Sequence, residues 1–149
     1  MNLVDAIESV LKHKDQNIWS VPPEAWIYDA IEIMANKYVG ALLVISNDKL
    51  VGIISERDYA RKVILQGKSS KQTQVREIMT SPVIFVGPGH TVEDCMKIMT
   101  NNRIRHLPVV NNEKVLGVVS IGDLVKWIVS AHQETIQELQ HYITGSYPR

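Results

Sequence analysis

The sequence predicts an α+β fold of two β-α-β-β-α repeats that are related by a pseudo-twofold axis, pack through their sheets and carry flanking N- and C-terminal helices. Residues 21–59 recur at residues 86–124 without a gap, so that Asp29 corresponds to Asp94 and Gly52 to Gly117. Thirteen of these pairs are identical, and many of the others exchange similar residues. A half of roughly 60 residues would be marginally stable alone, because small chains bury too little surface. The two halves are therefore expected to share one core.

Each repeat is expected to open with a short strand followed by a helix. The strands are predicted at 18–21 and 83–86, in β-rich runs that end close to a proline. Thr91 and Asp94 form a helix-start signal in the second repeat, whereas Trp26 stands at the matching place in the first. The helices themselves are predicted from apolar residues with the spacing of one helix face: Ile27, Ala30, Ile31 and Met34, and Val92, Cys95, Met96 and Met99.

A hairpin and a second helix complete each repeat. Polar turns at 46–49 and 111–114 are of hairpin type, and the second helix is expected to begin after Ser55 or Ser120. In the first repeat it should end near Gly67, a typical residue after a helix C-terminus, and a polar linker should follow up to Gln74. The hairpin strands are predicted at 41–45 and 50–54, and at 107–110 and 115–119.

Further helices flank the repeats. An N-terminal amphipathic helix is predicted from Val4, Ile7, Val10 and Leu11, and Val75, Ile78 and Met79 echo it before the second repeat. The last helix is expected to continue far beyond its counterpart, with an apolar stripe that a second subunit, or a helix folding back, would bury. This stripe consists of Val125, Ile128, Val129, His132, Ile136, Leu139 and Ile143, and it ends at Gly145.

Composition excludes several classes of function. Lys and Arg together number 16, as do Asp and Glu, so no net charge favours nucleic acid or an anionic membrane. The N-terminus lacks a basic region, and no apolar run approaches the length of roughly 18 residues that a membrane span needs. A single cysteine excludes an internal disulfide. These features predict a soluble, cytoplasmic protein.

The sequence also argues against catalysis. It has no nucleophile elbow, no P-loop, no dinucleotide-binding glycine motif and no zinc-protease motif. The five histidines show no metal-ligand spacing, and no cofactor or metal is expected to be required. Cys95 takes the place of Ala30 on the apolar face of its helix, which favours a small core residue over a reactive thiol.

The strand-to-helix junction that occurs twice is the candidate site. Ser55 is followed three residues later by Asp58, and Ser120 by Asp123. Such a pair is close to a capping box, which stabilises a helix start by around 1 kcal/mol without any ligand. A capping box prefers Glu or Gln, however, so aspartate in both copies suits an outward-facing role in which a carboxylate accepts hydrogen bonds from a ribose diol. A nearby helix start also favours an anion. The residue types alone leave the two interpretations equally open.

The repeat pair, with its hydrophobic-Gly-hydrophobic-hydrophobic-Ser-x-x-Asp close, resembles the cystathionine β-synthase (CBS) domain pair, or Bateman module. The resemblance places the first repeat at 10–70, after a helix over 2–14, the second at 75–130, and a C-terminal extension at 131–149. It implies clefts between paired repeats that bind adenosine-containing ligands such as AMP, ADP, ATP, S-adenosylmethionine or NAD(H).

The resemblance also implies roles for individual residues. Asp123 and Asp58 would hold the ribose hydroxyls, within junctions that also contain Ser120, Ile121 and Ser55. The first strand would line the adenine pocket, with Val83 and Ile84 in one copy and Ile18 and Trp19 in the other. Phosphate contacts would come from the strand after the first helix, where the second repeat has Arg103, Arg105 and His106 and the first has Gly40 and Ala41, or from Arg57, Arg61 and Lys62.

Alternatives apply to several of these residues. Trp19 is an aromatic residue on an apolar strand and suits a core position better than a stacking platform. Arg103 and Arg105 can be solvated charges at a sheet edge, where they discourage aggregation. Arg57 and its basic neighbours can simply face water. The Asp123 junction is expected to be the better site, because Ile84 leaves room that Trp19 would fill in the other copy.

Together these features predict a homodimeric, non-catalytic adenine-nucleotide sensor that acts in trans on an unknown protein. AMP is favoured because polyphosphates would need more cationic contacts, and NAD(H) or ATP remain possible. A ligand-free interaction protein that uses the C-terminal helix and the dimer surface is the main alternative. A weak nucleotide hydrolase is a third, which the missing nucleophile, base and metal ligands disfavour.

Overall fold

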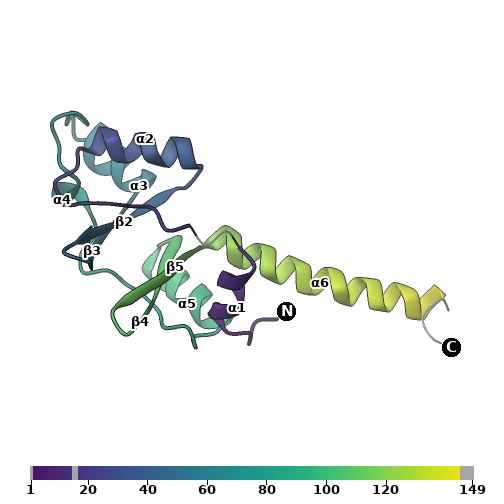
Figure 1. Cartoon of the computed structure of the whole chain (residues 1–149). Helices are drawn as coiled ribbons and strands as arrows, with labels where there is room; N and C mark the ends of the chain where they lie inside the picture. Colours follow the sequence, from purple (N-terminus) through teal and green to yellow (C-terminus); the bar gives the residue numbers. More distant parts are fainter. Residues whose placement is uncertain (1, 15–16, 145–149) are drawn as a thin grey trace. The chain divides into compact units, whose positions relative to one another are not determined.

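The computed structural model describes residues 2–14 and 17–144, with the side chains at 134–136, 138–139 and 141–144 left out. It contains helices and two small β-sheets (Figure 1). In chain order the elements are α1 (Ile7–Lys12), β1 (Ser20–Val21), α2 (Ile27–Lys37), β2 (Ala41–Ser46), β3 (Lys49–Ser55), α3 (Glu56–Tyr59), the π-helical turn η1 (Ala60–Ile64), α4 (Val75–Ile78), α5 (Val92–Asn102), β4 (His106–Asn111), β5 (Lys114–Ser120) and α6 (Ile121–Thr144). The predicted α+β class is confirmed, as is the order of elements in the two repeats except for the first strand of the second repeat.

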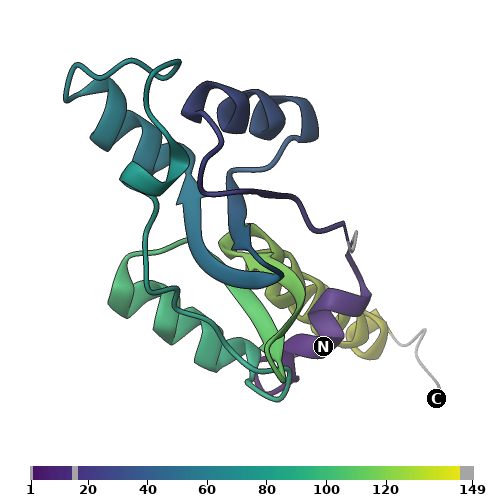
Figure 2. The same ribbon diagram turned by 60° about the vertical axis from the view of Figure 1, so that its left-hand side comes forward.

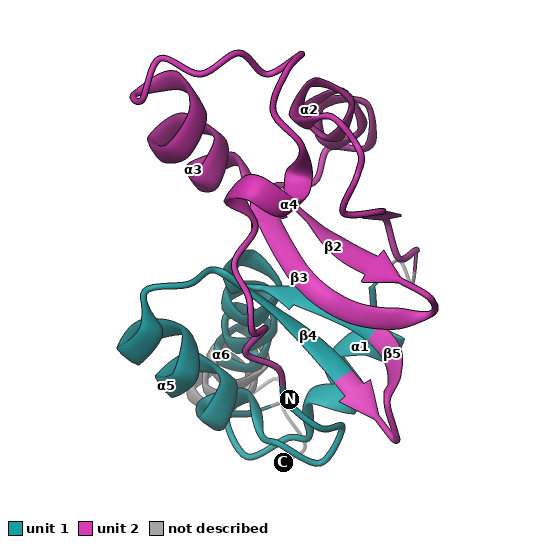
Figure 3. Ribbon diagram, turned by 90° about the vertical axis from the view of Figure 1, so that its left-hand side faces the viewer, with its two compact units in different colours: residues 1–16, 86–109, 117–149 teal, residues 17–85, 110–116 magenta. Residues whose placement is uncertain are grey.

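The chain forms two compact units that do not coincide with the two halves of the sequence (Figure 3). Unit 1 comprises Met1–Gln16, Val86–Val109 and Gly117–Arg149, and unit 2 comprises Asn17–Phe85 and Val110–Leu116. The N-terminal helix therefore belongs with the second repeat. The tip of the β4–β5 hairpin belongs with the first.

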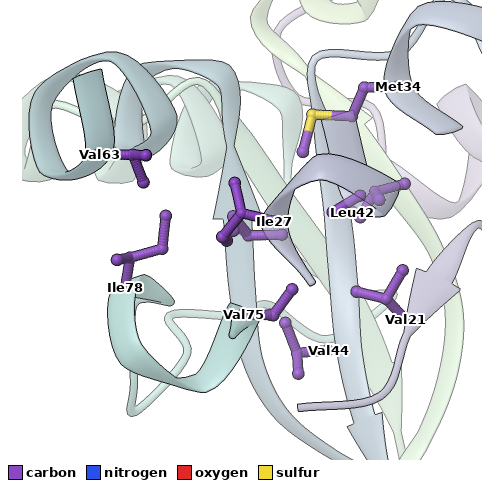
Figure 4. Close-up of a cluster of buried hydrophobic side chains, with 10 residues drawn as sticks. Val21, Ile27, Met34, Leu42, Val44, Val63, Val75 and Ile78 are labelled. Carbon is purple, nitrogen blue, oxygen red and sulfur yellow. The ribbon is translucent and has the colours of Figure 1, made fainter. Parts of the chain in front are cut away.

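Unit 2 is built on a three-stranded sheet in the order β1-β2-β3. β1 runs parallel to β2, and β2 is antiparallel to β3, with Ala41 opposite Ser55 and Ser46 opposite Lys49. The turn residues Asn47 and Asp48 both have positive φ, of 51° and 62°, which is the tight turn expected between twisted strands. Helix α2 buries its apolar face with this sheet and with α4. The cluster comprises Val21, Ile27, Ala30, Met34, Leu42, Val44, Ile54, Val63, Val75 and Ile78 (Figure 4).

Unit 1 repeats this plan with a weaker first strand. The segment 83–86, predicted as a strand, makes only a single parallel β-bridge, from Val86 to Val109. A physical reason lies in Pro108. The corresponding residue in the first repeat, Leu43, donates its N–H to the carbonyl of Trp19 at 3.2 Å, whereas proline has no N–H to donate. The sheet of the second repeat therefore has two strands, β4 and β5.

The helix that precedes each repeat packs with the other repeat's elements. In unit 1 a β-bridge joins Ala6 to Thr91, and the N–H of Ile7 donates to the carbonyl of His90 at 2.7 Å, so α1 lies next to the start of α5 (Figure 2). In unit 2 the equivalent bridge joins Trp26 to Gln74, beside α4. These exchanges bury the N-terminal residues Ile7, Val10 and Leu11 in unit 1.

The start of each first helix follows the prediction. Thr91 and Asp94 close a full capping box at α5, with two hydrogen bonds of 3.0 Å. Trp26 provides no side-chain cap for α2. Instead, the carbonyl of Thr73 accepts the N–H of Ile27 at 2.9 Å, so the loop before α4 satisfies that helix start.

One glycine in each unit allows the preceding helix to pack closely. A Cβ on Gly117 of β5 would lie 2.9 Å from Leu11 Cδ2 of α1. A Cβ on Gly52 of β3 would lie 2.5 Å from Met79 Sδ, directly after α4. Real Cβ atoms essentially never make contacts this short. The repeated glycine therefore marks the contact between a strand and its exchanged helix.

The second helices of the two repeats end differently, as expected. The first reaches only as far as η1, and Gly67 follows with φ +68°. The second, α6, is one continuous helix to Thr144, and Figure 1 shows its C-terminal half extending beyond α1 and α5 of the same unit. Val125 and Val129 of the predicted stripe are 48% and 46% exposed, whereas Leu124 and Trp127 face the core of unit 1. The rest of the predicted stripe lies outside the described part of the structure. This applies to the side chains of Ile136, Leu139 and Ile143 and to the whole of Gly145.

Candidate functional site

The junction of unit 1 holds Asp123 by three contacts. Asp123 Oδ2 accepts the backbone N–H of Ser120 at 2.8 Å and an N–H of the Lys14 ammonium at 2.7 Å. The backbone N–H of Asp123 donates to Ser120 Oγ at 3.2 Å. Lys14 also donates to the carbonyl of Val118 at 2.7 Å, so its ammonium bridges the strand β5 and the first turn of α6.

The junction of unit 2 has the same construction. Asp58 Oδ2 accepts the backbone N–H of Ser55 at 3.0 Å and its hydroxyl at 3.1 Å, and the N–H of Asp58 donates to Ser55 Oγ at 3.2 Å. The Lys62 ammonium lies 3.2 Å from Asp58 Oδ1 and donates to the carbonyl of Ile78 at 3.0 Å. Each aspartate is thus held by its serine and by a lysine.

Aspartate forms a capping box at both junctions, contrary to the prediction that it suits an outward-facing role better than a cap. Asp58 and Asp123 both reach back to the amide of their serine, because the junction serine is extended and brings its N–H toward the third helical residue. Capping and ligand binding do not exclude each other. A carboxylate offers about four lone-pair sites. Ser120 and Lys14 occupy two of those of Asp123, and Ser55 and Lys62 make three contacts with Asp58, so both carboxylates keep capacity for a further donor.

Two titratable groups in unit 1 have displaced pKa values. Burial by itself raises the pKa of Asp123, but the hydrogen bond from Lys14, together with the amide of Ser120 and the ammonium charge, holds that pKa below its ordinary value. Burial lowers the pKa of His106, with Lys14 and Arg105 adding to the effect and Asp123 opposing it. This shift favours the neutral form of His106 at pH 7, which makes it a weaker source of positive charge for a phosphate than an arginine.

The loop before each hairpin reaches its junction through the backbone. The N–H of Ile121 donates to the carbonyl of Arg105 at 2.9 Å, and the N–H of Glu56 donates to the carbonyl of Gly40 at 3.1 Å. Arg105 and His106 therefore lie at the start of α6, and Gly40 and Ala41 at the start of α3. Arg103 does not lie at a junction by these contacts. It is the C-terminal cap of α5, with φ 54°, and its side chain is exposed.

The predicted adenine-pocket residues lie in unit 2. Val83 and Ile84 are in the irregular segment before Val86, and their place beside Asp123 of unit 1 stays a prediction. Trp19 packs against the core of unit 2, and the Lys37 ammonium lies 4.5 Å from the centre of its ring. These contacts support the core role for Trp19. Arg57 lies in the first turn of α3, half-buried, and its role as a phosphate contact stays a prediction.

Sequence reasoning missed Lys14. It lies 109 residues before Asp123, just after a helix that was assigned to the flank of the first repeat. The signal that points to it is the exchange of α1 into unit 1, which pairs Leu11 with Gly117 and brings the following residues to the end of β5. Lys62 was noted only as one of several basic residues on its helix.

Two other kinds of site, a metal site and a reactive cysteine, find no support in the described part of the chain, so the junctions remain the main candidate site. Among the residues that the structure describes, no group of three His, Cys, Asp or Glu side chains lies close enough together to hold a metal ion. None of the described helices is long and apolar enough to cross a membrane. Cys95 is fully buried on α5.

Cys95 is expected to be inert toward thiol reagents in the folded protein. Burial raises the pKa of its thiol to about 11, with the nearby Asp94 adding to the effect, so almost no thiolate forms at pH 8. A disulfide reagent that releases a coloured thiolate should react with the protein only after addition of guanidinium chloride. Rapid reaction of the native protein would show that Cys95 is accessible and would contradict its role as a core residue.

The family model for the CBS domain matches residues 5–64 and 75–130, which include both junctions and both exchanged helices. This chain belongs to the CBS domain family. CBS domain pairs generally bind adenosine-containing ligands and act as regulatory modules.

Individual relatives agree with this assignment. The chain is 43% identical over 151 residues to the mitochondrial CBS domain-containing protein CBSX3 of Arabidopsis thaliana, and the match covers 95% of this chain and 73% of that protein. A solved protein with CBS domains from Burkholderia ambifaria MC40-6 is 47% identical with a TM-score of 0.83, covering 85% of this chain and 95% of that one. The CBS domain pair of protein MJ0100, in complex with 5′-methylthioadenosine and S-adenosyl-L-methionine, shares the fold at 24% identity, with a TM-score of 0.76 and coverage of 86% and 98%.

Proposed function

We propose that this CBS domain pair is a non-catalytic sensor that binds an adenine nucleotide and acts in trans on a protein partner. The observation that carries the proposal is the duplicated junction, in which Asp58 and Asp123 are each fixed at the start of a helix by their own serine. A fixed carboxylate is a preorganised acceptor for the two hydroxyls of a ribose. Membership of a family that binds adenosine-containing ligands supports this use of the junction.

AMP is the favoured ligand, with NAD(H) and ATP as the other candidates. Arg105 and the two junction lysines supply a limited positive charge around the helix starts, and the lowered pKa of His106 favours its neutral form at pH 7. A single phosphate matches this charge better than a triphosphate does. The Asp123 junction is the stronger candidate site, with the Asp58 junction as a second one.

The signal would be a shift between two arrangements of the repeats. A ligand can shift such an equilibrium only by the difference between its affinities for the two states. The exposed stripe that begins with Val125 and Val129 on α6 suits burial by a second copy, so the sensor is proposed to be a homodimer. The domain limits of 10–70, 75–130 and 131–149 and the cytoplasmic location belong to the same proposal, although the Arabidopsis relative is named as mitochondrial.

Isothermal titration tests the proposal. The protein is stripped of bound nucleotide and titrated with AMP, ATP, NAD+, NADH and S-adenosylmethionine, alongside Asp123→Ala and Asp58→Ala. Asp94→Ala is the matched control, because Asp94 closes the same kind of capping box on α5 but lies outside both junctions. We expect AMP to bind with micromolar affinity at the Asp123 junction, Asp123→Ala to abolish binding at that junction and Asp94→Ala to preserve it.

The alternative function is that of an interaction protein that binds no ligand, and the capping boxes at the two junctions favour it. The capping boxes give Ser55, Asp58, Ser120 and Asp123 a structural role that needs no ligand. Absence of binding across the whole panel would establish this alternative and make α6 the working surface. Turnover of ATP or NAD+ that Asp123→Ala abolishes would instead show an enzyme.

A further inference from the structure

Both junction aspartates are held by a lysine in the same way. Each ammonium donates to a backbone carbonyl next to the junction and also contacts the carboxylate: Lys14 at 2.7 Å from both Val118 O and Asp123, and Lys62 at 3.0 Å from Ile78 O and 3.2 Å from Asp58. Two of the three ammonium hydrogens are thereby directed toward the protein.

The two lysines are not copies of each other. Lys14 comes from the segment between α1 and β1, whereas Lys62 lies one helical turn after its own aspartate. The residue of the second repeat that corresponds to Lys62 is Trp127, whose indole N–H donates to Asp5. Duplication therefore does not account for the second lysine. Two non-equivalent chain positions thus place a lysine ammonium against the equivalent aspartates, Lys14 against Asp123 and Lys62 against Asp58.

Stability alone is a weak reason for this recurrence. The Lys62 side chain is 41% exposed and that of Lys14 is 29% exposed, and ion pairs near solvent contribute only about 0–1 kcal/mol. The serine amides already provide each aspartate with its cap. A role in ligand selection explains why both sites have the lysine.

The positive charge of the lysine can favour a ligand that carries a phosphate. A carboxylate that holds a ribose would repel the phosphate attached to the same nucleoside, by roughly 1 kcal/mol for unit charges 4 Å apart in water and by more where water is displaced. An ammonium 2.7 Å from Asp123 cancels this repulsion. Arg105, which also acts electrostatically on neighbouring His106, then leaves the junction of unit 1 with a net positive charge.

We infer that Lys14 and Lys62 set the ligand charge preference of the two junctions, so that each selects an anionic nucleotide over the neutral nucleoside. The inference rests on the proposed nucleotide-binding function and names the residues that give it specificity. Lys14 and Lys62 are positioning residues: they hold the aspartate and offset its charge.

AMP and adenosine are the probes, because they share base and ribose and differ only in the phosphate. Both are titrated into the wild type, Lys14→Met, Lys62→Met, the double variant and Lys14→Arg. Lys97→Met and Lys12→Met are the controls, since these exposed lysines pair with Glu93 and Glu8 one turn away on their own helices. Circular dichroism establishes that each variant is folded, and Lys14→Gln replaces Lys14→Met if that variant is not.

We expect the double variant to lose about ten-fold in affinity for AMP, equivalent to about 1.4 kcal/mol, while its affinity for adenosine changes less than about three-fold. Lys14→Arg should retain most of the preference in unit 1, and both controls should match the wild type. Equal losses for AMP and adenosine would show that the lysines only support the aspartate and would overturn the inference, as would unchanged AMP binding. A wild type that binds neither ligand would refute the proposed function itself, and a wild type that binds both equally would refute only the charge preference.

Discussion

Gly117→Val is expected to destabilise the protein by about 3 kcal/mol, a large share of the roughly 5–15 kcal/mol that holds a typical domain together. Even a Cβ at this position would lie 2.9 Å from Leu11 Cδ2, and Leu11 is itself buried between β5 and the rest of unit 1. Valine would force α1 away from the sheet. Equilibrium unfolding in urea, monitored by circular dichroism, measures the loss.

Two further variants make this test specific. Gly89 has nothing within 4 Å of its would-be Cβ, so Gly89→Ala should be nearly neutral, whereas Gly117→Ala should cost a measurable part of the valine effect. Leu11→Ala destabilises on its own but provides room, so its effect and that of Gly117→Ala should be less than additive. Full additivity, or a Gly117→Val protein as stable as the wild type, would contradict the contact between α1 and β5.

Asp123→Ala is expected to cost about 1–3 kcal/mol of unfolding free energy at pH 7, apart from any effect on ligand binding. The variant removes the acceptor of the Ser120 amide at the start of α6 and leaves Lys14 with one protein partner fewer. The pKa of Asp123 is lowered from its ordinary value of 3.8, so its contribution is present above about pH 3.8 and is lost as pH falls through the lower, folded pKa. The difference between wild type and variant should therefore narrow in acid.

Asp94→Ala is the matched control for this second prediction. It removes an equivalent capping box, but its carboxylate is exposed, and His90 and Lys97 act on it only as nearby charges. The amount by which Asp123→Ala lowers the unfolding free energy more than Asp94→Ala does then measures the contribution of the Lys14–Asp123 ion pair. A double-mutant cycle of Asp123→Ala with Lys14→Met should give the same interaction free energy. Equal costs for the two aspartates, or zero coupling, would mean that the ion pair adds nothing to the cap.

Local signals in the sequence predicted most of the fold correctly. The hairpin turns at Asn47 and Asn112, the capping box of Thr91 and the helix end at Gly67 depend on residues a few positions apart, and all four are present as expected. Because the two halves are repeats, an element predicted in one half was also predicted at the corresponding residues of the other. Where such a prediction was wrong, as for the strand at 83–86, a single residue, Pro108, had removed a donor that its counterpart provides.

The candidate site was less accessible to sequence reasoning because it depends on contacts between distant segments. Asp58 and Asp123 were identified from the repeated motif, but the lysine at Asp123 comes from the far end of the chain. Periodicity shows that α1 is amphipathic without showing which surface covers it. Only the exchange of α1 into unit 1 places Lys14 at the junction.

This exchange also constrains how the chain folds during its synthesis. Residues 17–85, which form nearly all of unit 2, leave the ribosome as one continuous stretch, whereas α1 emerges before that stretch and its partners in unit 1 emerge after it. At roughly 5–20 residues per second, α1 waits several seconds for β5. Ile7, Val10 and Leu11 are without their final contacts throughout that interval. Helix α1 is thus synthesised before unit 2 but reaches its native place after unit 2 is complete, and it brings the lysine of the Asp123 junction with it.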